Sequence, residues 1–225
     1  MRRAQLIRAA GGLVAAILTA AAPPESCGAE RYDADLASSR VTIGGTSTLH
    51  DWHAEGHHVG GYVLVQEGEL ASLWTDSGPS LQKLAPTVSV EIPVTSLTSG
   101  KRGMDDKMHE ALKAGAHPLI TYRLESAKLT GRQAAQAESE DGSLMIDTTG
   151  VLTVAGVEQT MDIPMRIRRL PDHRLEISGD TSLRMTEFGI DPPKAMLGTI
   201  RTGDAVRVRW TWVLARGRTD TGDVR

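Results

Sequence analysis

An apolar residue occupies every second position in four consecutive stretches between Leu144 and Leu214. The apolar rows are Leu144, Ile146, Leu152 and Val154; Met161, Ile163, Met165 and Ile167; Leu175, Ile177, Leu183 and Met185; and Val206, Val208, Trp210, Trp212 and Leu214. A period of two is the period of a β-strand that buries one face. Consecutive one-sided strands favour an antiparallel sheet that closes on itself, because closure removes the exposed edges.

Earlier segments with a related pattern complete a predicted set of eight strands. These segments are 38–46, 53–65, 87–97 and 119–129. One phase of the third segment is aliphatic, and we expect it to face the interior: Val88, Val90, Ile92 and Val94. Glycines interrupt the second segment, where they indicate bulges or barrel corners: Gly56, Gly60 and Gly61. The pattern therefore predicts an all-β fold, an eight-stranded antiparallel barrel.

One segment between the third and fourth strands departs from the strand period. Met104, Met108 and Leu112 recur at helical spacing, which predicts an amphipathic helix over residues 104–114. Gly115 is well suited to end this helix as its C-cap. We expect the helix to pack across or beside one opening of the barrel.

The first 29 residues have the pattern of a secretory signal peptide. Basic residues near the start precede a 12-residue apolar run at 11–22, which is too short to span a bilayer. We expect cleavage near Ala29, a barrel domain over 30–215 and a disordered polar tail over 216–225. The exported domain would be periplasmic or secreted, and no later segment is apolar enough to span a membrane.

Composition narrows the classes of function. The chain has 225 residues and a net charge of −3. Loss of Arg2, Arg3, Arg8 and Glu25 with the signal would bring the net charge to −5. A mildly acidic domain argues against nucleic acid as a partner.

Cys27 is the only cysteine, so no disulfide framework is expected. No nucleophile elbow or glycine-rich phosphate loop is visible, and we do not expect an enzyme.

The pattern leaves open whether the barrel interior is filled. Small residues stand at mid-strand in the inward phase: Thr148, Gly150, Gly179 and Thr181. They leave volume that Trp210 and Trp212, which we expect to face the interior, could fill to give a solid core. If the interior is hollow, its aliphatic walls suit a lipid rather than a sugar or nucleotide.

A histidine cluster supports a different hypothesis. Four histidines lie within nine residues: His50, His53, His57 and His58. In an extended segment His53 and His57 would share one face, and a metal or haem site would need at least one further ligand such as His50. The spacing matches no standard zinc site. We therefore keep a metal-binding module as an alternative and assign no metal.

Several segments, taken in order, resemble the YceI-like family of secreted bacterial proteins. These segments are the opening at 32–43, the strand at 90–97 ending in Ser-Leu, the Asp-Lys-Met-His to His-Pro-Leu-Ile-Thr-Tyr block at 106–122, the Gly-Val-Leu-Thr-Val-Ala-Gly-Val hairpin at 150–157, and Phe-Gly-Ile at 188–190. The chain departs from the family pattern at Tyr122, where a phenylalanine is usual, and at Thr186-Glu187, where a basic-acidic pair is usual.

The resemblance implies a lipocalin-like barrel that binds polyisoprenoids. The expected function is non-enzymatic binding, sequestration or transport of an amphiphilic isoprenoid lipid, a quinone or a polyprenyl compound, in the periplasm. We expect these residues to line its site: Met104, Met108, Leu112, Tyr122, Ile146, Thr148, Leu152, Trp210 and Trp212. We expect no cofactor beyond that lipid. A homodimer and a solid barrel acting as an interaction domain are the alternatives retained.

Overall fold

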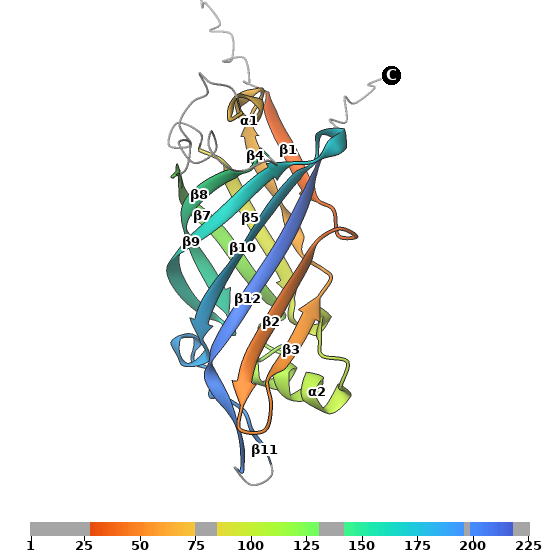
Figure 1. Ribbon diagram of the computed structural model, residues 1–225, viewed down its shortest axis with the longest axis vertical. Helices are drawn as coiled ribbons and strands as arrows, with labels where there is room; N and C mark the ends of the chain where they lie inside the picture. Colours follow the sequence, from red (N-terminus) through yellow and green to blue (C-terminus); the bar gives the residue numbers. More distant parts are fainter. Residues whose placement is uncertain (1–27, 75–84, 131–141, 196–198, 218–225) are drawn as a thin grey trace, which may run out of the picture.

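The computed structural model describes residues 28–74, 85–130, 142–195 and 199–217, and they form a closed antiparallel β-barrel (Figure 1). Around the ring the strands are β1 (Ala29–Ala34), β4 (Gly60–Gln66), β5 (Thr87–Pro93), β7 (Leu119–Leu129), β8 (Leu144–Val154), β9 (Val157–Arg169), β10 (Leu175–Arg184) and β12 (Ile200–Arg216). Pairing of β12 with β1 closes the ring. The predicted eight-stranded antiparallel barrel is confirmed.

Three of the eight strands are broken into two pieces, which the sequence pattern did not separate. Breaks lie between β1 and β2 (Arg40–Ser47), between β3 (Trp52–Gly56) and β4, and between β5 and β6 (Leu97–Thr98). Near the end of the barrel that carries α2 (Arg102–Ala111), the sheet continues from β12 through β2 and β3 to β6. The interruption in the predicted 53–65 strand falls between Gly56 and Gly60, as the glycines indicated.

The first break is held by a buried serine. The Ser39 hydroxyl accepts the Val213 N–H at 3.0 Å and donates to the Val213 carbonyl at 3.3 Å. The Asp35 N–H donates to the same carbonyl at 2.8 Å. These bonds satisfy backbone groups of β12 where the β1–β2 strand leaves the ladder. The chain can therefore change direction inside the barrel wall without leaving unpaired polar groups there.

The first strand of the barrel, β1, was missed in the sequence. Only Tyr32 of β1 is fully buried, so this strand has almost no apolar alternation to reveal it. Tyr32 pairs with Arg216 in the ladder between β1 and β12 that closes the ring. The Gly217 N–H donates to the Arg31 carbonyl at 2.7 Å. β12 therefore runs one residue past the predicted domain end at 215. Residues 218–225 lie outside the described residues, and the disordered tail stays a prediction.

The signal peptide prediction falls almost entirely outside the described residues, which begin at Gly28. Ala29, the last residue of the expected signal, is the first residue of β1 and pairs with Gln66. The position of cleavage stays a prediction.

The strand registers agree with the predicted phases. Val88, Val90 and Ile92 face the interior, and Val94 is completely buried just after β5 ends. Pro93 cannot continue the ladder as a donor, and a 3₁₀ turn follows at Val94–Ser96. The predicted tight hairpin between β8 and β9 is also present, with Gly156 at a φ of 83°.

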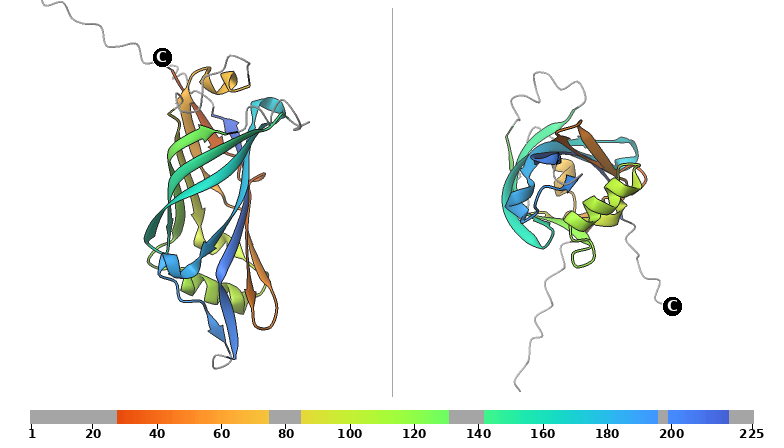
Figure 2. Two further views of the ribbon diagram at one scale, coloured as in Figure 1. Left: turned by 60° about the vertical axis from the view of Figure 1, so that its left-hand side comes forward. Right: turned by 90° about the horizontal axis from the view of Figure 1, so that it is seen from below.

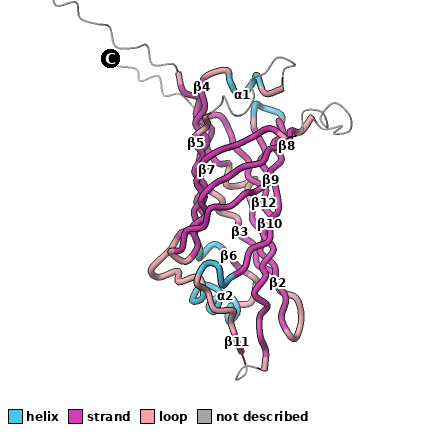
Figure 3. Tube along the Cα trace, turned by 90° about the vertical axis from the view of Figure 1, so that its left-hand side faces the viewer, coloured by secondary structure: helices cyan, strands magenta, loops and turns pink. Residues whose placement is uncertain are grey.

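Short elements cap the two ends of the barrel (Figures 2 and 3). At the upper end, α1 (Glu69–Ser72), which was not predicted, brings Leu70 and Leu73 into the core. Trp74 follows, and its indole N–H donates to the Gly142 carbonyl at 2.9 Å. The lower end carries α2, together with β11 (Lys194–Ala195) and the 3₁₀ turn at Met185–Phe188. A third 3₁₀ turn lies at Pro171–His173.

The helix α2 confirms the predicted element but shifts its boundaries from 104–114 to 102–111. Gly115 is not its left-handed cap, because Lys113 adopts that conformation with a φ of 54°. The Ala114 N–H donates to the His109 carbonyl at 2.9 Å, which tightens the turn before Gly115 is reached. Within the described residues, none of the helices has the length and apolar character needed to cross a membrane.

Lys113→Gly should raise the free energy of unfolding by about 0.5–1 kcal/mol, because glycine adopts a positive φ without steric cost. Gly115→Ala is the matched control: no atom lies within 4 Å of the Cβ it would add, so it should cost little. Urea denaturation measures both variants. A loss of stability in Lys113→Gly, together with a clear loss in Gly115→Ala, would contradict this assignment of the cap.

Candidate functional site

The barrel encloses a cavity of about 550 Å³. This volume lies within the range of roughly 300–1,000 Å³ that is usual for small-molecule sites. The sequence did not decide between a hollow and a filled barrel interior. In the structure the interior is hollow. The solid-barrel alternative is therefore wrong.

The inward phases of the strands build the cavity walls. The strands from β5 onward contribute Val88, Val90, Ile92, Ile120, Tyr122, Leu124, Ile146, Thr148, Leu152, Val154, Ile163, Met165, Ile167, Ile177, Thr181, Leu183, Val206, Val208, Trp210 and Trp212. Among the described residues, no aspartate or glutamate lines the cavity. Burial of a lipid tail against such walls is favourable, at about 25 cal/mol per Å² of apolar surface removed from water.

Aromatic rings lie directly over the inward glycines. The indole of Trp210 covers Gly179, its partner on β10, and the ring of Tyr122 covers Gly150 on β8. A Cβ at either glycine would overlap the ring. Because these glycines have no Cβ, the aromatic rings can lie against the barrel wall. The glycines do not by themselves account for the open volume of the cavity.

Two of the polar side chains that line the cavity, Tyr122 and Thr148, bind one another. The Tyr122 hydroxyl donates to Thr148 Oγ1 at 3.1 Å, and the Thr148 hydroxyl donates to the Ile163 carbonyl at 2.7 Å. Burial raises the pKa of Tyr122 above its usual value of 10.0, so the phenol is neutral at physiological pH. This chain of bonds holds the Tyr122 ring in place and offers no activated nucleophile.

Trp212 differs from the other polar groups of the wall. Trp212 is 3% exposed. Its indole Nε1 is buried and has no hydrogen-bond partner among the described residues. A buried donor without a partner lowers stability. The packing of the indole must therefore offset this cost.

All nine side chains expected at the ligand site line this one cavity. Met104 and Met108 reach it from α2, and Leu112 reaches it from the C-cap of that helix. The other six reach it from β7, β8 and β12: Tyr122, Ile146, Thr148, Leu152, Trp210 and Trp212. Their role as ligand contacts stays a prediction. Sequence reasoning missed Leu70, Leu73, Phe188 and Ile190, which also line the cavity. They stand in short segments whose apolar residues show no strand period.

The exposed side of the cavity is at the lower end of the barrel. The exposed lining residues come from the β2–β3 turn, α2, the end of β10 and β11: His50, Gly103, Lys107, Arg184 and Lys194. At the upper end the lining residues of α1 and its C-cap, Leu70 and Leu73, are buried. The cavity therefore opens at the end of the barrel where α2 lies. Figure 2 shows α2 at that end.

Few contacts attach α2 to the barrel rim. The His109 ring nitrogen Nε2 lies 2.8 Å from the Leu97 carbonyl, within hydrogen-bond distance. The Asp105 carboxylate accepts hydrogen bonds from the Ser99 hydroxyl at 2.6 Å and from the Ser99 N–H at 2.7 Å. The hydroxyl bond, and then the N–H bond, lower the pKa of Asp105 from its usual 3.8.

This lowered pKa predicts an acid-sensitive anchor for α2. The ionised Asp105 stabilises the fold above the usual carboxyl pKa, and that contribution is lost as pH falls through the lower folded-state value. We expect the urea midpoints of the wild type and Asp105→Asn to differ at pH 7 and to converge below about pH 4. Denaturation across pH 3–7 measures this, and a constant difference would contradict it.

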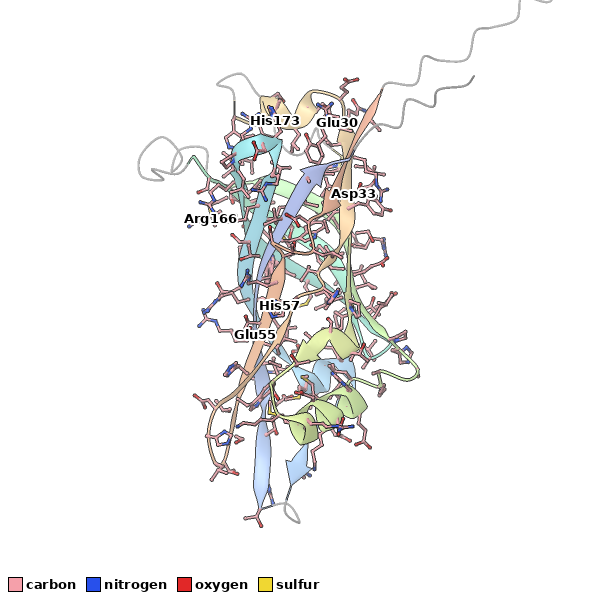
Figure 4. The ribbon with its side chains drawn as sticks, turned by 90° about the vertical axis from the view of Figure 1, so that its right-hand side faces the viewer. Glu30, Asp33, Glu55, His57, Arg166 and His173 are labelled. Carbon is pink, nitrogen blue, oxygen red and sulfur yellow. The ribbon has the colours of Figure 1, made fainter. Side chains whose placement is uncertain are left out.

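The histidines do not converge on one site. His53 is exposed on β3, and His50 lies in the β2–β3 turn at the cavity opening. His57 Nε2 lies 3.8 Å from an oxygen of Glu55, with both side chains exposed (Figure 4). Within the part of the chain that the structure describes, no group of three or more histidine, cysteine or acidic side chains could hold a metal ion.

Comparisons with known proteins agree with the architecture. A family model, described as YceI-like domain, matches residues 32–214. The crystal structure of Burkholderia cenocepacia BcnA is similar with a TM-score of 0.60 at 16% identity, covering 80% of this chain and 99% of BcnA. A polyisoprenoid binding domain from Saccharophagus degradans also gives 0.60, at 12% identity, covering 83% of this chain and 98% of that domain. No curated protein matches the chain. Because the family model spans most of its length, the chain belongs to the YceI-like domain family.

Proposed function

We propose that this protein binds an amphiphilic isoprenoid lipid, a quinone or a polyprenyl compound, without altering it chemically. The observation that carries the proposal is the cavity inside the barrel, which has aliphatic and aromatic walls and no carboxylate among the described residues that line it. A flexible branched tail suits these walls, and Met104, Met108 and Met165 can adapt to its shape.

The cavity volume limits how much of the lipid is enclosed. With a volume of about 550 Å³, the cavity has the size of a small-molecule site and encloses only part of a long polyprenyl chain. Such a chain would leave its remaining units and its head group outside, and the opening beside α2 is the exit that we propose.

One of the two similar structures supports the same class of ligand. The Saccharophagus degradans domain is a polyisoprenoid binding domain implicated in plant cell wall breakdown. For the present chain we propose sequestration or transport in the periplasm after export, with the N-terminal segment as the signal. The proposal includes no catalytic step, because the cavity hydroxyls of Tyr122 and Thr148 are engaged in hydrogen bonds.

Tryptophan fluorescence tests binding directly. A long-chain quinone that enters the cavity should quench Trp210 and Trp212, which line its wall, and the quenching should saturate at one ligand per chain. The same quinone head without a long tail should quench only at much higher concentration, because it buries little apolar surface. No saturable quenching of correctly folded protein would contradict the proposed function for this ligand.

A further inference from the structure

Among the described residues, every charged side chain that lines the cavity is basic. Lys107 of α2, Arg184 at the end of β10 and Lys194 of β11 contribute to its walls, and all three are exposed. Their elements meet at the lower end of the barrel, where the cavity opens (Figure 1). The neutral cavity therefore ends in a basic rim, which we define as Lys107, Arg184 and Lys194.

The rim is not neutralised by ion pairs. Within the described parts of the chain, none of the three side chains has a carboxylate oxygen within 4.0 Å. Asp204 is the acidic group that interacts electrostatically with Arg184. Its carboxylate already accepts the Thr186 N–H and the Thr186 hydroxyl, both at 2.9 Å.

The nearby acidic residues of α2 do not enter the cavity. Asp105 is bound to Ser99, and neither Asp106 nor Glu110 lines the cavity. Long basic side chains can lay their aliphatic stems along an apolar wall while the charged ends stay in water. The rim thus places three cations around the outlet of an uncharged, apolar cavity.

We propose that the basic rim binds an anionic head group, so that the protein prefers amphiphiles ending in a phosphate or carboxylate over neutral ones. This inference rests on the proposed function, and it separates the two lipid classes named there. A polyprenyl phosphate places its charge at the rim while its tail fills the cavity. A quinone head is uncharged and gains no such attraction.

A matched pair of ligands tests the preference. Geranylgeranyl monophosphate and geranylgeraniol have the same 20-carbon tail and differ in the head group. The wild-type protein should bind the phosphate about tenfold more tightly, as expected from a few exposed ion pairs. The preference should shrink as salt is raised from ~0.02 M to ~0.5 M, because exposed charges are screened. Inorganic phosphate alone should not compete at matched concentration.

Two triple variants locate the effect. Lys107→Gln, Arg184→Gln and Lys194→Gln together should bind both lipids with the affinity of the alcohol. The control removes the same charge from the outer surface, through Arg123→Gln, Lys128→Gln and Arg166→Gln, and should keep the preference. All six side chains are exposed, so both variants should fold.

Each outcome decides between the two proposals. Equal affinity of the wild type for both lipids, or a preference that survives in the rim variant, would overturn the basic rim and leave lipid binding intact. Equally tight binding of inorganic phosphate would also overturn it, since the anion would then not need the tail. If neither lipid binds the folded wild type, the proposed function fails together with this inference.

Discussion

Thr181→Trp should weaken isoprenoid binding by at least about a hundredfold while the barrel stays folded. Thr181 lines the cavity from the middle of β10, pairs with Val208 and is only partly buried, so a larger side chain there occupies open volume. If the indole displaces one isoprene unit, the loss is on the order of 4 kcal/mol at ~0.8 kcal/mol for each carbon. That corresponds to roughly a thousandfold in affinity.

The neighbouring residue provides the control. Ser182 is exposed on the outer face of the same strand, so Ser182→Trp adds the same side chain outside the cavity. It should leave binding unchanged. Isothermal titration with geranylgeraniol compares both variants with the wild type. Normal binding by Thr181→Trp, with the new indole shown by fluorescence to be buried, would contradict a tail at this depth of the barrel.

Trp212→Ala should lower the free energy of unfolding by about 3–5 kcal/mol, the usual cost of truncating a buried aromatic residue. Trp212 is 3% exposed and belongs to the core cluster with Leu175, Ile177 and Leu214. Trp210→Ala should cost less, because Trp210 is partly exposed beside open space and has fewer packing contacts to lose.

Trp212→Phe separates packing from hydrogen bonding. It keeps much of the aromatic bulk and removes the indole N–H, which has no partner in the described structure. Removing an unpaired buried donor offsets part of the loss, so this variant should be much closer to the wild type than Trp212→Ala. Urea denaturation measures all three variants. Equal costs for Trp210→Ala and Trp212→Ala would contradict the difference in packing described for the two indoles.

The alternation of apolar residues was sufficient to predict the barrel and most of its inward faces. Some rows of apolar residues face the interior along the whole of a long strand, such as Val206, Val208, Trp210 and Trp212. A shift of one residue in the strand pairing would turn all of these side chains outward. The pattern failed where strands are short or broken. β1 buries only Tyr32 completely, and its place is fixed by pairing with β4 and β12, which are distant in sequence.

The hollow interior could not be predicted from the same rows. Trp210 could fill the barrel or lie flat against its wall, and the difference depends on Gly179, which lies on another strand and has room for the ring. The closed upper end depends on Leu70 and Leu73, which belong to a four-residue helix and its C-cap. Both features arise from tertiary packing between residues that are distant in sequence, and the local pattern does not reveal that packing.

The basic rim was also invisible in sequence. Lys107, Arg184 and Lys194 are far apart along the chain, and each alone reads as an ordinary solvated residue. Only closure of the barrel brings α2, β10 and β11 to one opening. By contrast, the histidines that are adjacent in sequence are spread over the turn, the outer face of β3 and the segment after it.

Extraction of the protein purified from its native host tests the central claim most directly. Protein isolated without detergent is treated with organic solvent, and the extract is analysed by mass spectrometry beside an extract from Thr181→Trp prepared in the same way. The account predicts about one isoprenoid lipid per wild-type chain and far less from the variant. Repeated recovery of empty wild-type protein that also takes up no isoprenoid on incubation would contradict it.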